Sequence, residues 1–202
     1  MPQTLTADGT SKFVQAGDVR IHYNEAGQGH PVIMLHGSGA GATGWSNFNA
    51  NMGYLADFYR VIAVDMPGWG QSDAVTIDNR DHAAQLLAFM DALGIDKAAL
   101  IGNSMGGMTA LSFAVRYPDR ISHLITMGPG APGVRLFSPG DGWSEGIKVL
   151  IKGYEEPTPE TMRELVNIMT YDSSFVTDTL VKQRSESALS NPTHLKNFLD
   201  GW

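Results

Sequence analysis

The chain has 202 residues, carries a net charge of −7 at pH 7 and contains no cysteine. Its length suits one sizeable hydrophobic core rather than two domains with separate cores. The acidic balance argues against nucleic acid and anionic membranes as partners, and the lack of cysteine excludes a disulfide framework, a thiolate metal site and a cysteine nucleophile.

Residues 1–12 are polar, and no stretch of the sequence is long and apolar enough to cross a bilayer. We therefore expect a soluble cytoplasmic protein with no membrane partner. The sequence shows no internal repeat, low-complexity tract or flexible linker, which favours a single domain with an insertion.

The first two thirds of the chain predict strands that alternate with helices. Gly17-Asp18 is a turn signal between two alternating runs and predicts an antiparallel hairpin. The later apolar runs are continuous, as is typical of strands buried on both faces. In chain order we expect strands over residues 12–16, 19–24, 31–35, 60–65, 98–101 and 121–127, and helices over 45–58, around 86–93 up to Gly94, and from 105 to 117.

This alternation predicts an α/β fold with a mostly parallel, doubly wound sheet and a ligand crevice at the carboxyl ends of the strands. Glycine-rich loops follow three of the strands, so we expect these loops to converge there. From about Ser138 the apolar strand runs stop, and helices are expected over 145–154, 158–169, 173–189 and from 193 onward. We interpret residues 1–137 as the core and 138–202 as a helical lid.

The sequence Gly102-Asn103-Ser104-Met105-Gly106 joins an apolar run to a helical pattern. This strand, turn and helix are typical of a nucleophile elbow, in which a strained turn exposes a serine hydroxyl above the sheet. Gly102 and Gly106 must be small for the strand and the helix to approach each other. The backbone N–H of Met105, at a helix N-terminus, can stabilise an oxyanion.

Several motifs together resemble the α/β-hydrolase fold and, within it, the meta-cleavage product hydrolases. The family cleaves a carbon–carbon bond in the 2-hydroxy-6-oxo-dienoates that ring-cleaving dioxygenases release from aromatic compounds, and it uses no cofactor. The motifs are His36-Gly37-Ser38-Gly39, Asp65-Met66-Pro67-Gly68-Trp69-Gly70-Gln71-Ser72, Gly102-Asn103-Ser104-Met105-Gly106-Gly107, Tyr117-Pro118-Asp119-Arg120, Met127-Gly128-Pro129-Gly130 and Pro192-Thr193-His194-Leu195-Lys196-Asn197-Phe198-Leu199.

The resemblance implies a role for each matched position. Ser104 would be the nucleophile, and the backbone N–H groups of Ser38 and Met105 would form the oxyanion hole. Arg184 would clamp the substrate carboxylate, because its planar fork matches a carboxylate in two hydrogen bonds. The other residues expected to line the substrate site are Asn103, Asn47, Gly37, Gly39 and Met169.

Each of these residues also has a simpler, purely structural interpretation. Arg184 could lie on a solvated helix face, Asn103 could cap its turn, and Ser38 could be a small residue in a glycine loop. Trp45 and Trp69 are interpreted as packing residues. Ser185 stands directly after the arginine where many members of the family have an aromatic residue, and Met169 stands where some have phenylalanine, so the shape of the substrate tail stays open.

A serine nucleophile needs a histidine base and an acid that orients it. After Ser104 the sequence has only His123, expected at the strand end remote from the crevice, and His194, expected as a helix cap or surface residue. The acids Asp141 and Asp172 are expected in the lid. We therefore expect no complete triad among these residues, and interpret the chain as a shortened form of a longer hydrolase that lacks the catalytic Asp and His. In such a chain residues 121–127 would form an exposed apolar edge.

Two other functions remain open. One is a carboxylesterase for small esters, which would have no need of a carboxylate clamp. The other is a non-catalytic remnant that binds small acids or pairs with another subunit, and a homo-oligomer is one such outcome. A dehalogenase is disfavoured because Ser104 stands where its nucleophilic Asp would be. No cluster of side chains suggests a metal.

Overall fold

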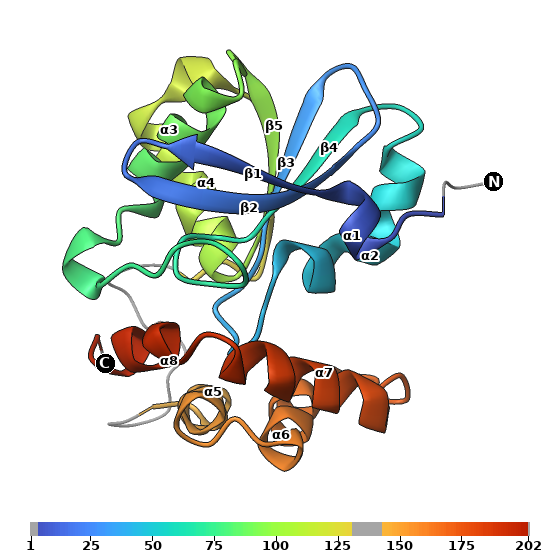
Figure 1. The fold of residues 1–202 in the computed structure, drawn as a ribbon, viewed down its shortest axis with the longest axis vertical. Coiled ribbons are helices and arrows are strands. Elements are labelled where there is room, and N and C mark those ends of the chain that lie inside the picture. The colour runs from blue at the N-terminus through green and yellow to red at the C-terminus, as the bar shows by residue number, and fades with distance from the viewer. Residues whose placement is uncertain (1–3, 131–142, 202) are drawn as a thin grey trace.

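A computed structural model of the chain describes residues 4–130 and 143–201. Within this part, one sheet of six strands has the order β1-β2-β4-β3-β5-β6 (Figure 1). The strands are β1 (Ser11–Ala16), β2 (Val19–Ala26), β3 (Pro31–Leu35), β4 (Arg60–Val64), β5 (Ala98–Asn103) and β6 (Ile121–Met127).

The sheet is mixed but mostly parallel beyond its first two strands. β1 and β2 form the expected antiparallel hairpin, and β2 pairs antiparallel with β4. The pairs β3–β4, β3–β5 and β5–β6 are parallel. The predicted α/β fold and hairpin are therefore confirmed.

Helices cover both faces of the sheet because alternate strand residues point to opposite sides. Val32 and Met34 pack with Phe48 on the face covered by α2 (Gly44–Leu55). Ile33 and Leu35 belong to the larger core, which contains Phe89 and Phe113 from the helices of the other face. Those helices are α3 (His82–Ala92) and α4 (Met105–Arg116), and the remaining short helices of this region are α1 (Ala7–Thr10), η1 (Ile77–Asn79) and η2 (Pro118–Arg120).

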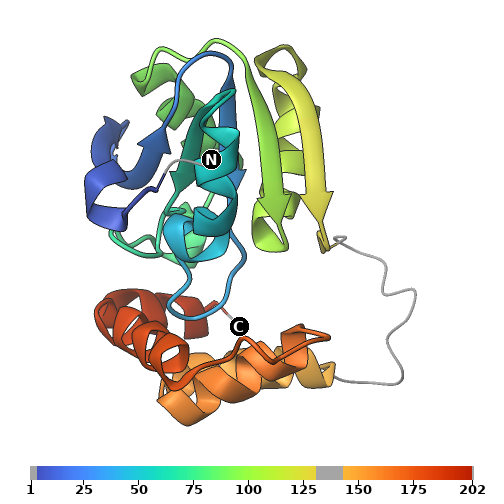
Figure 2. The same cartoon turned by 90° about the vertical axis from the view of Figure 1, so that its right-hand side faces the viewer.

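Four further helices form a separate layer across the carboxyl ends of the strands, toward which β5 and β6 point (Figure 2). They are α5 (Glu145–Glu155), α6 (Pro159–Met169), α7 (Asp178–Leu189) and α8 (Pro192–Leu199). The expected boundary at residues 137 and 138 lies outside the described residues.

Two predicted helix limits were wrong. The helix expected over 173–189 begins only at Asp178, because the Thr177 side chain accepts the Leu180 amide and caps it there. The helix expected to reach residue 58 ends at Leu55, where backbone bonds of the following turn replace the helical pattern.

β6 lies at the edge of the sheet in the described part of the chain. Its side chains Leu124, Ile125 and Met127 are 38%, 55% and 44% exposed, as expected for an uncovered apolar edge. None of the described helices has the length and apolarity needed to span a membrane.

Candidate active site

Ser104 stands in a strained turn between β5 and α4. Its φ of 50° and ψ of −114° make it the one non-glycine residue with positive φ in the described ranges. A Cβ on Gly102 would lie 2.4 Å from the Gly106 carbonyl oxygen, and one on Gly106 would lie 2.1 Å from the Leu35 carbonyl oxygen. Neither position can hold a side chain, which explains the glycines of the elbow.

The loop after β3 runs beside this elbow. A Cβ on Gly37 would lie 3.3 Å from Ser104 Cβ and 3.5 Å from Asn103 Nδ2, so Gly37 directly neighbours the turn. His36 holds the loop through both of its ring nitrogens. Its Nε2 accepts the Met66 N–H at 3.0 Å, so the ring proton is on Nδ1, which donates to the Gly37 carbonyl oxygen at 2.7 Å. Burial of the ring lowers the pKa of His36, which favours this neutral form.

Ser38 is held through its carbonyl group. The Tyr154 hydroxyl, from α5, donates to the Ser38 carbonyl oxygen at 2.6 Å and accepts the Trp69 Nε1–H at 2.9 Å. The backbone N–H groups of Ser38 and Met105 have no hydrogen-bond acceptor within residues 4–130 and 143–201. As far as the described residues show, both amides are therefore available to bind an oxygen atom.

Arg184 lies at the other end of the same loop. Its Nη2 would be 2.9 Å from a Cβ on Gly39 and donates weakly to the Ala40 carbonyl oxygen at 3.4 Å. Its Nε is buried without a partner, and the described residues include no carboxylate paired with it. Burial lowers the pKa of the guanidinium. Arg184 is therefore not part of a solvated face, and a buried cation without a counter-ion has unmet capacity for an anion.

Asn103 and Asn47 approach each other. Asn103 Nδ2 lies 3.4 Å from Asn47 Oδ1, and Asn47 Nδ2 in turn donates to the Thr43 carbonyl at 3.2 Å. The Asn103 side chain thus points toward α2, and its amide nitrogen bonds to Asn47 rather than capping the turn of the elbow. Two amide side chains therefore lie between the elbow and the beginning of α2.

Met169 stands apart from this group. It ends α6 with 54% of its surface exposed, and its Cε would be 3.8 Å from a Cβ on Gly146. The structure brings Gly37, Asn103 and Asn47 to the Ser104 turn and Arg184 to Gly39, and it shows no contact between Met169 and these residues.

None of the six histidines, all of which are described, is hydrogen-bonded to the Ser104 hydroxyl. His123 lies near the start of β6, at the end remote from the carboxyl end of the strand, as expected, and its side chain is exposed. The expectation for His194 was wrong: it is 3% exposed, because α8 packs its ring 4.2 Å from Trp69. Among the candidate acids, Asp172 is exposed in the loop before α7, and Asp141 lies outside the described residues.

Sequence reasoning missed a buried polar cluster that side chains of α3, α5 and α8 form around Trp69. Trp69, interpreted as packing, is indeed 1% exposed, but it also joins Tyr154, His82 and His194. Burial and the nearby Arg80 lower the pKa of His82 to about 4 and that of His194 to about 3. A single tyrosine at the end of an otherwise apolar helix face was the one available signal for Tyr154.

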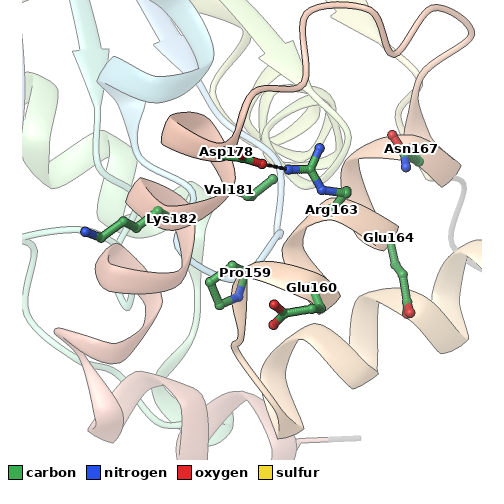
Figure 3. A pocket seen from close by; sticks show the side chains of 8 residues that line it. All are labelled: Pro159, Glu160, Arg163, Glu164, Asn167, Asp178, Val181 and Lys182. Carbon is green, nitrogen blue, oxygen red and sulfur yellow. Dashed lines mark hydrogen bonds and ion pairs between the residues drawn. The ribbon is translucent and has the colours of Figure 1, made fainter.

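Two hollows flank these elements. One, of about 600 Å³, lies between α3 and α4 and is bordered by Met105, Met108 and His82. The other, of about 570 Å³, lies between α6 and α7, where Arg163 pairs with Asp178 (Figure 3). The second is lined by charged and polar side chains and contains none of the expected site residues. The first therefore adjoins the elbow, and the second does not.

Comparison with known proteins agrees with this geometry. The family described as alpha/beta hydrolase fold matches residues 30–183. A 2-hydroxy-6-oxo-6-phenylhexa-2,4-dienoate hydrolase of Comamonas testosteroni is 48% identical over 96% of this chain and 71% of its own length. A 2-hydroxy-6-oxononadienedioate/2-hydroxy-6-oxononatrienedioate hydrolase of the same species is 47% identical with the same coverage.

A solved structure is also similar. The meta-cleavage product hydrolase of Pseudomonas fluorescens IP01 has a TM-score of 0.83 and 34% identity over 94% of this chain and 67% of that one. The family match, the sequence identities and the structural similarity together show that the chain belongs to the α/β-hydrolase fold family and, within it, is homologous to the meta-cleavage product hydrolases.

Proposed function

We propose that this chain binds a 2-hydroxy-6-oxo-dienoate and acts in the hydrolysis of its carbon–carbon bond, with Ser104 as the nucleophile. The observation that supports this most is Arg184, whose buried guanidinium lies over Gly39 with an unpartnered Nε and no paired carboxylate among the described residues. The carboxylate of a dienoate would supply the missing anion.

The glycine loop would set the position of the substrate. Gly37 neighbours Ser104 and Gly39 neighbours Arg184, so an extended acid bound along this loop would reach from the guanidinium to the serine. Asn103 and Asn47 would bind its 2-hydroxyl end, because their amide groups already approach each other at 3.4 Å. Met169, at the end of α6, is proposed only as part of the wall around the substrate tail.

The reaction would depend on stabilising the negative charge that develops on the substrate ketone oxygen. Attack on the 6-oxo carbon by Ser104 or by water places negative charge on the ketone oxygen, and the free N–H groups of Ser38 and Met105 would bind that oxyanion. Cleavage then releases a hydroxydienoate and a carboxylic acid. The step needs a base for the serine or water proton, and none of the six histidines bonds to Ser104, so binding and turnover are separate measurements.

The lid and the location belong to the same proposal. We propose residues 138–202 as the lid over the site, supported by the contact of α5 with Ser38 through Tyr154. The cytoplasm is the proposed location. The exposed apolar edge of β6 favours association with a second copy, which sedimentation would detect.

The decisive experiment measures binding and loss of a coloured ring-cleavage dienoate beside a nitrophenyl ester. Replacing Arg184 with Met should weaken dienoate binding by about tenfold to a hundredfold, the value of a charge-assisted bidentate contact, and should leave the ester almost unaffected. The change Ser104→Ala should abolish any turnover while dienoate binding persists.

Lys182 supplies the matched control. It lies two residues away on α7 and is 71% exposed, in a long contact of 3.8 Å with Glu186. Lys182→Met removes the same charge from a solvated position and should leave dienoate binding unchanged. Equal effects of the two substitutions, or equal losses on the ester and the dienoate when Arg184 is replaced, would refute the clamp. Turnover of the ester without binding of the dienoate would favour the carboxylesterase.

A further inference from the structure

A second serine, remote from Ser104 in sequence, takes part in a chain of hydrogen bonds to a histidine and an aspartate. Ser11 Oγ lies 2.9 Å from His22 Nε2, and His22 Nδ1 lies 2.8 Å from Asp65 Oδ2. Ser11 is exposed at the start of β1, whereas the side chains of His22 and Asp65 are 5% and 1% exposed. This is the order of groups that activates a serine hydroxyl.

The positions of the protons follow from the surrounding donors. Asp65 accepts the backbone N–H of Gly44 at 2.7 Å on Oδ1 and that of Gln71 at 3.0 Å on Oδ2. Because its oxygens are engaged as acceptors, the proton of the contact with His22 belongs to Nδ1. His22 Nε2 then keeps its lone pair toward the Ser11 hydroxyl.

The histidine is held rigidly in this orientation. Its ring packs against Phe13 with a centroid distance of 4.8 Å, and its backbone N–H donates to Ser72 Oγ at 2.9 Å. A Cβ on Gly70 would lie 2.0 Å from Asp65 Oδ2, so glycine is required where the loop passes the carboxylate. Thus the imidazole and the carboxylate are preorganised.

Ser11 and His22 open into their own pocket, of about 210 Å³, at the junction of β2, α2 and α7. Its wall includes Thr43, Gln71 and Ser190, and it contains neither Ser104 nor Arg184. The Gln71 side-chain nitrogen lies 3.4 Å from His22 Nε2 and is thus an N–H donor beside the serine. The volume suits a short acyl group and a small leaving group.

We propose that Ser11, His22 and Asp65 form a second nucleophilic site that takes a short acyl group from an activated ester, independently of Ser104. Ser11 Oγ attacks the ester carbonyl carbon and gives its proton to His22 Nε2. The bond to the leaving alcohol breaks, and the alcohol takes that proton from His22. Water then releases the acid from the acyl serine by the same route, so protons and electrons balance.

The test uses the full chain with Ser104→Ala, so that the elbow serine cannot react. The protein is incubated with 4-nitrophenyl acetate, and the acetylated peptides are identified by mass spectrometry. Acetylation of Ser11 should exceed that of Ser190 by at least about tenfold, since a positioned general base contributes more than this. Ser190 is the control because it lines the same pocket and its hydroxyl, within the described part of the chain, donates to the Ser187 carbonyl and contacts no imidazole. Equal acetylation of the two serines would overturn the proposal, as would absent acetylation of Ser11 together with a release of 4-nitrophenolate that the further change Ser11→Ala does not lower.

A second pair of variants tests His22 without depending on acyl chemistry. The chain has no cysteine, so Ser11→Cys and Ser190→Cys each introduce a unique thiol. At pH 7 the thiol at position 11 should be alkylated by iodoacetamide about tenfold faster, because an adjacent imidazole favours the thiolate. Adding His22→Asn, which keeps an N–H for Asp65, should remove the difference. Equal rates for the two single variants would contradict the proposed base.

Discussion

The Tyr154 hydroxyl donates its single hydrogen to the Ser38 carbonyl oxygen at 2.6 Å. The Tyr154 hydroxyl oxygen itself accepts from Trp69 Nε1 at 2.9 Å and lies 3.3 Å from His194 Nε2. Since the hydroxyl hydrogen is already used, His194 must donate from Nε2, which leaves its Nδ1 bare and, among the described residues, unpartnered. The Tyr154 side chain of α5 thus holds the carbonyl group of Ser38, in the loop that runs beside the elbow.

The change Tyr154→Phe should therefore destabilise the fold. It removes the partner of the Ser38 carbonyl and of the buried Trp69 N–H, and each unsatisfied buried group costs about 1–3 kcal/mol. Urea unfolding measures the loss. Tyr171→Phe is the control: because Tyr171 is fully exposed, this change should leave the stability unaltered. A midpoint for Tyr154→Phe that matches the control would contradict the role of this hydroxyl.

Stability should fall as the pH is lowered from 6.5 toward 5. In the unfolded chain His82 and His194 bind protons near pH 6.5, whereas in the folded protein burial keeps them neutral until about pH 4 and 3. The unfolded state therefore binds more protons in this window, and the free energy of unfolding should decrease by about 1.4 kcal/mol per pH unit for each histidine at the steepest.

Urea titrations at several pH values in this range check the slope, because carboxyl groups with ordinary pKa values barely titrate there. The change His123→Gln is the control, since that exposed ring is not in the buried cluster and its loss should leave the slope unaltered. If the free energy of unfolding did not change between pH 6.5 and 5, the prediction that His82 and His194 are buried in the neutral form would be contradicted.

The glycines of the elbow should tolerate no side chain. A Cβ on Gly106 meets a backbone oxygen at 2.1 Å, so Gly106→Ala must push β3 and α4 apart and should cost more than about 3 kcal/mol. Gly17→Ala is the comparison: its φ is +61° but nothing lies within 4 Å, so only the conformational cost of about 1 kcal/mol applies. Similar melting temperatures for the two variants would contradict this packing.

The variant Ser104→Ala should be less stable than the variant Ser104→Gly. Its φ of 50° and ψ of −114° are strained for any residue with a Cβ, and such strain costs about 1–3 kcal/mol. The change Ser104→Gly relieves it, whereas Ser104→Ala does not, and both remove the hydroxyl. Thermal unfolding should place the glycine variant above the alanine variant. The reverse order would show that the turn is relaxed.

Local signals in the sequence were sufficient for the strands and the elbow. The limits predicted for β3 and β6 agree with the structure at residues 31–35 and 121–127. β3 is a continuous apolar run that is buried within the sheet, whereas β6 mixes apolar and polar residues and is half-buried or exposed at the edge. The pattern of the sequence therefore predicted the limits of both strands but not the burial of β6. The closeness of Gly102 and Gly106 to the backbone could also be expected, since a strand that turns directly into a helix leaves no space for a side chain.

The environments of His194 and Arg184 could be known only from the tertiary structure. His194 follows Pro192 in a polar stretch that looks exposed, yet α8 packs its ring on Trp69; Arg184 lies on a mostly polar helix, yet its guanidinium lies over Gly39. Periodicity reports which face of an element is apolar, but it carries no information about which distant loop that element will cover. Ser11, His22 and Asp65 come from three separate segments for the same reason. The sequence by itself determined the elements and the elbow through local sterics and hydrophobic pattern. The packing of helices α5 to α8 against the rest of the fold decided which polar groups are buried, paired or left free.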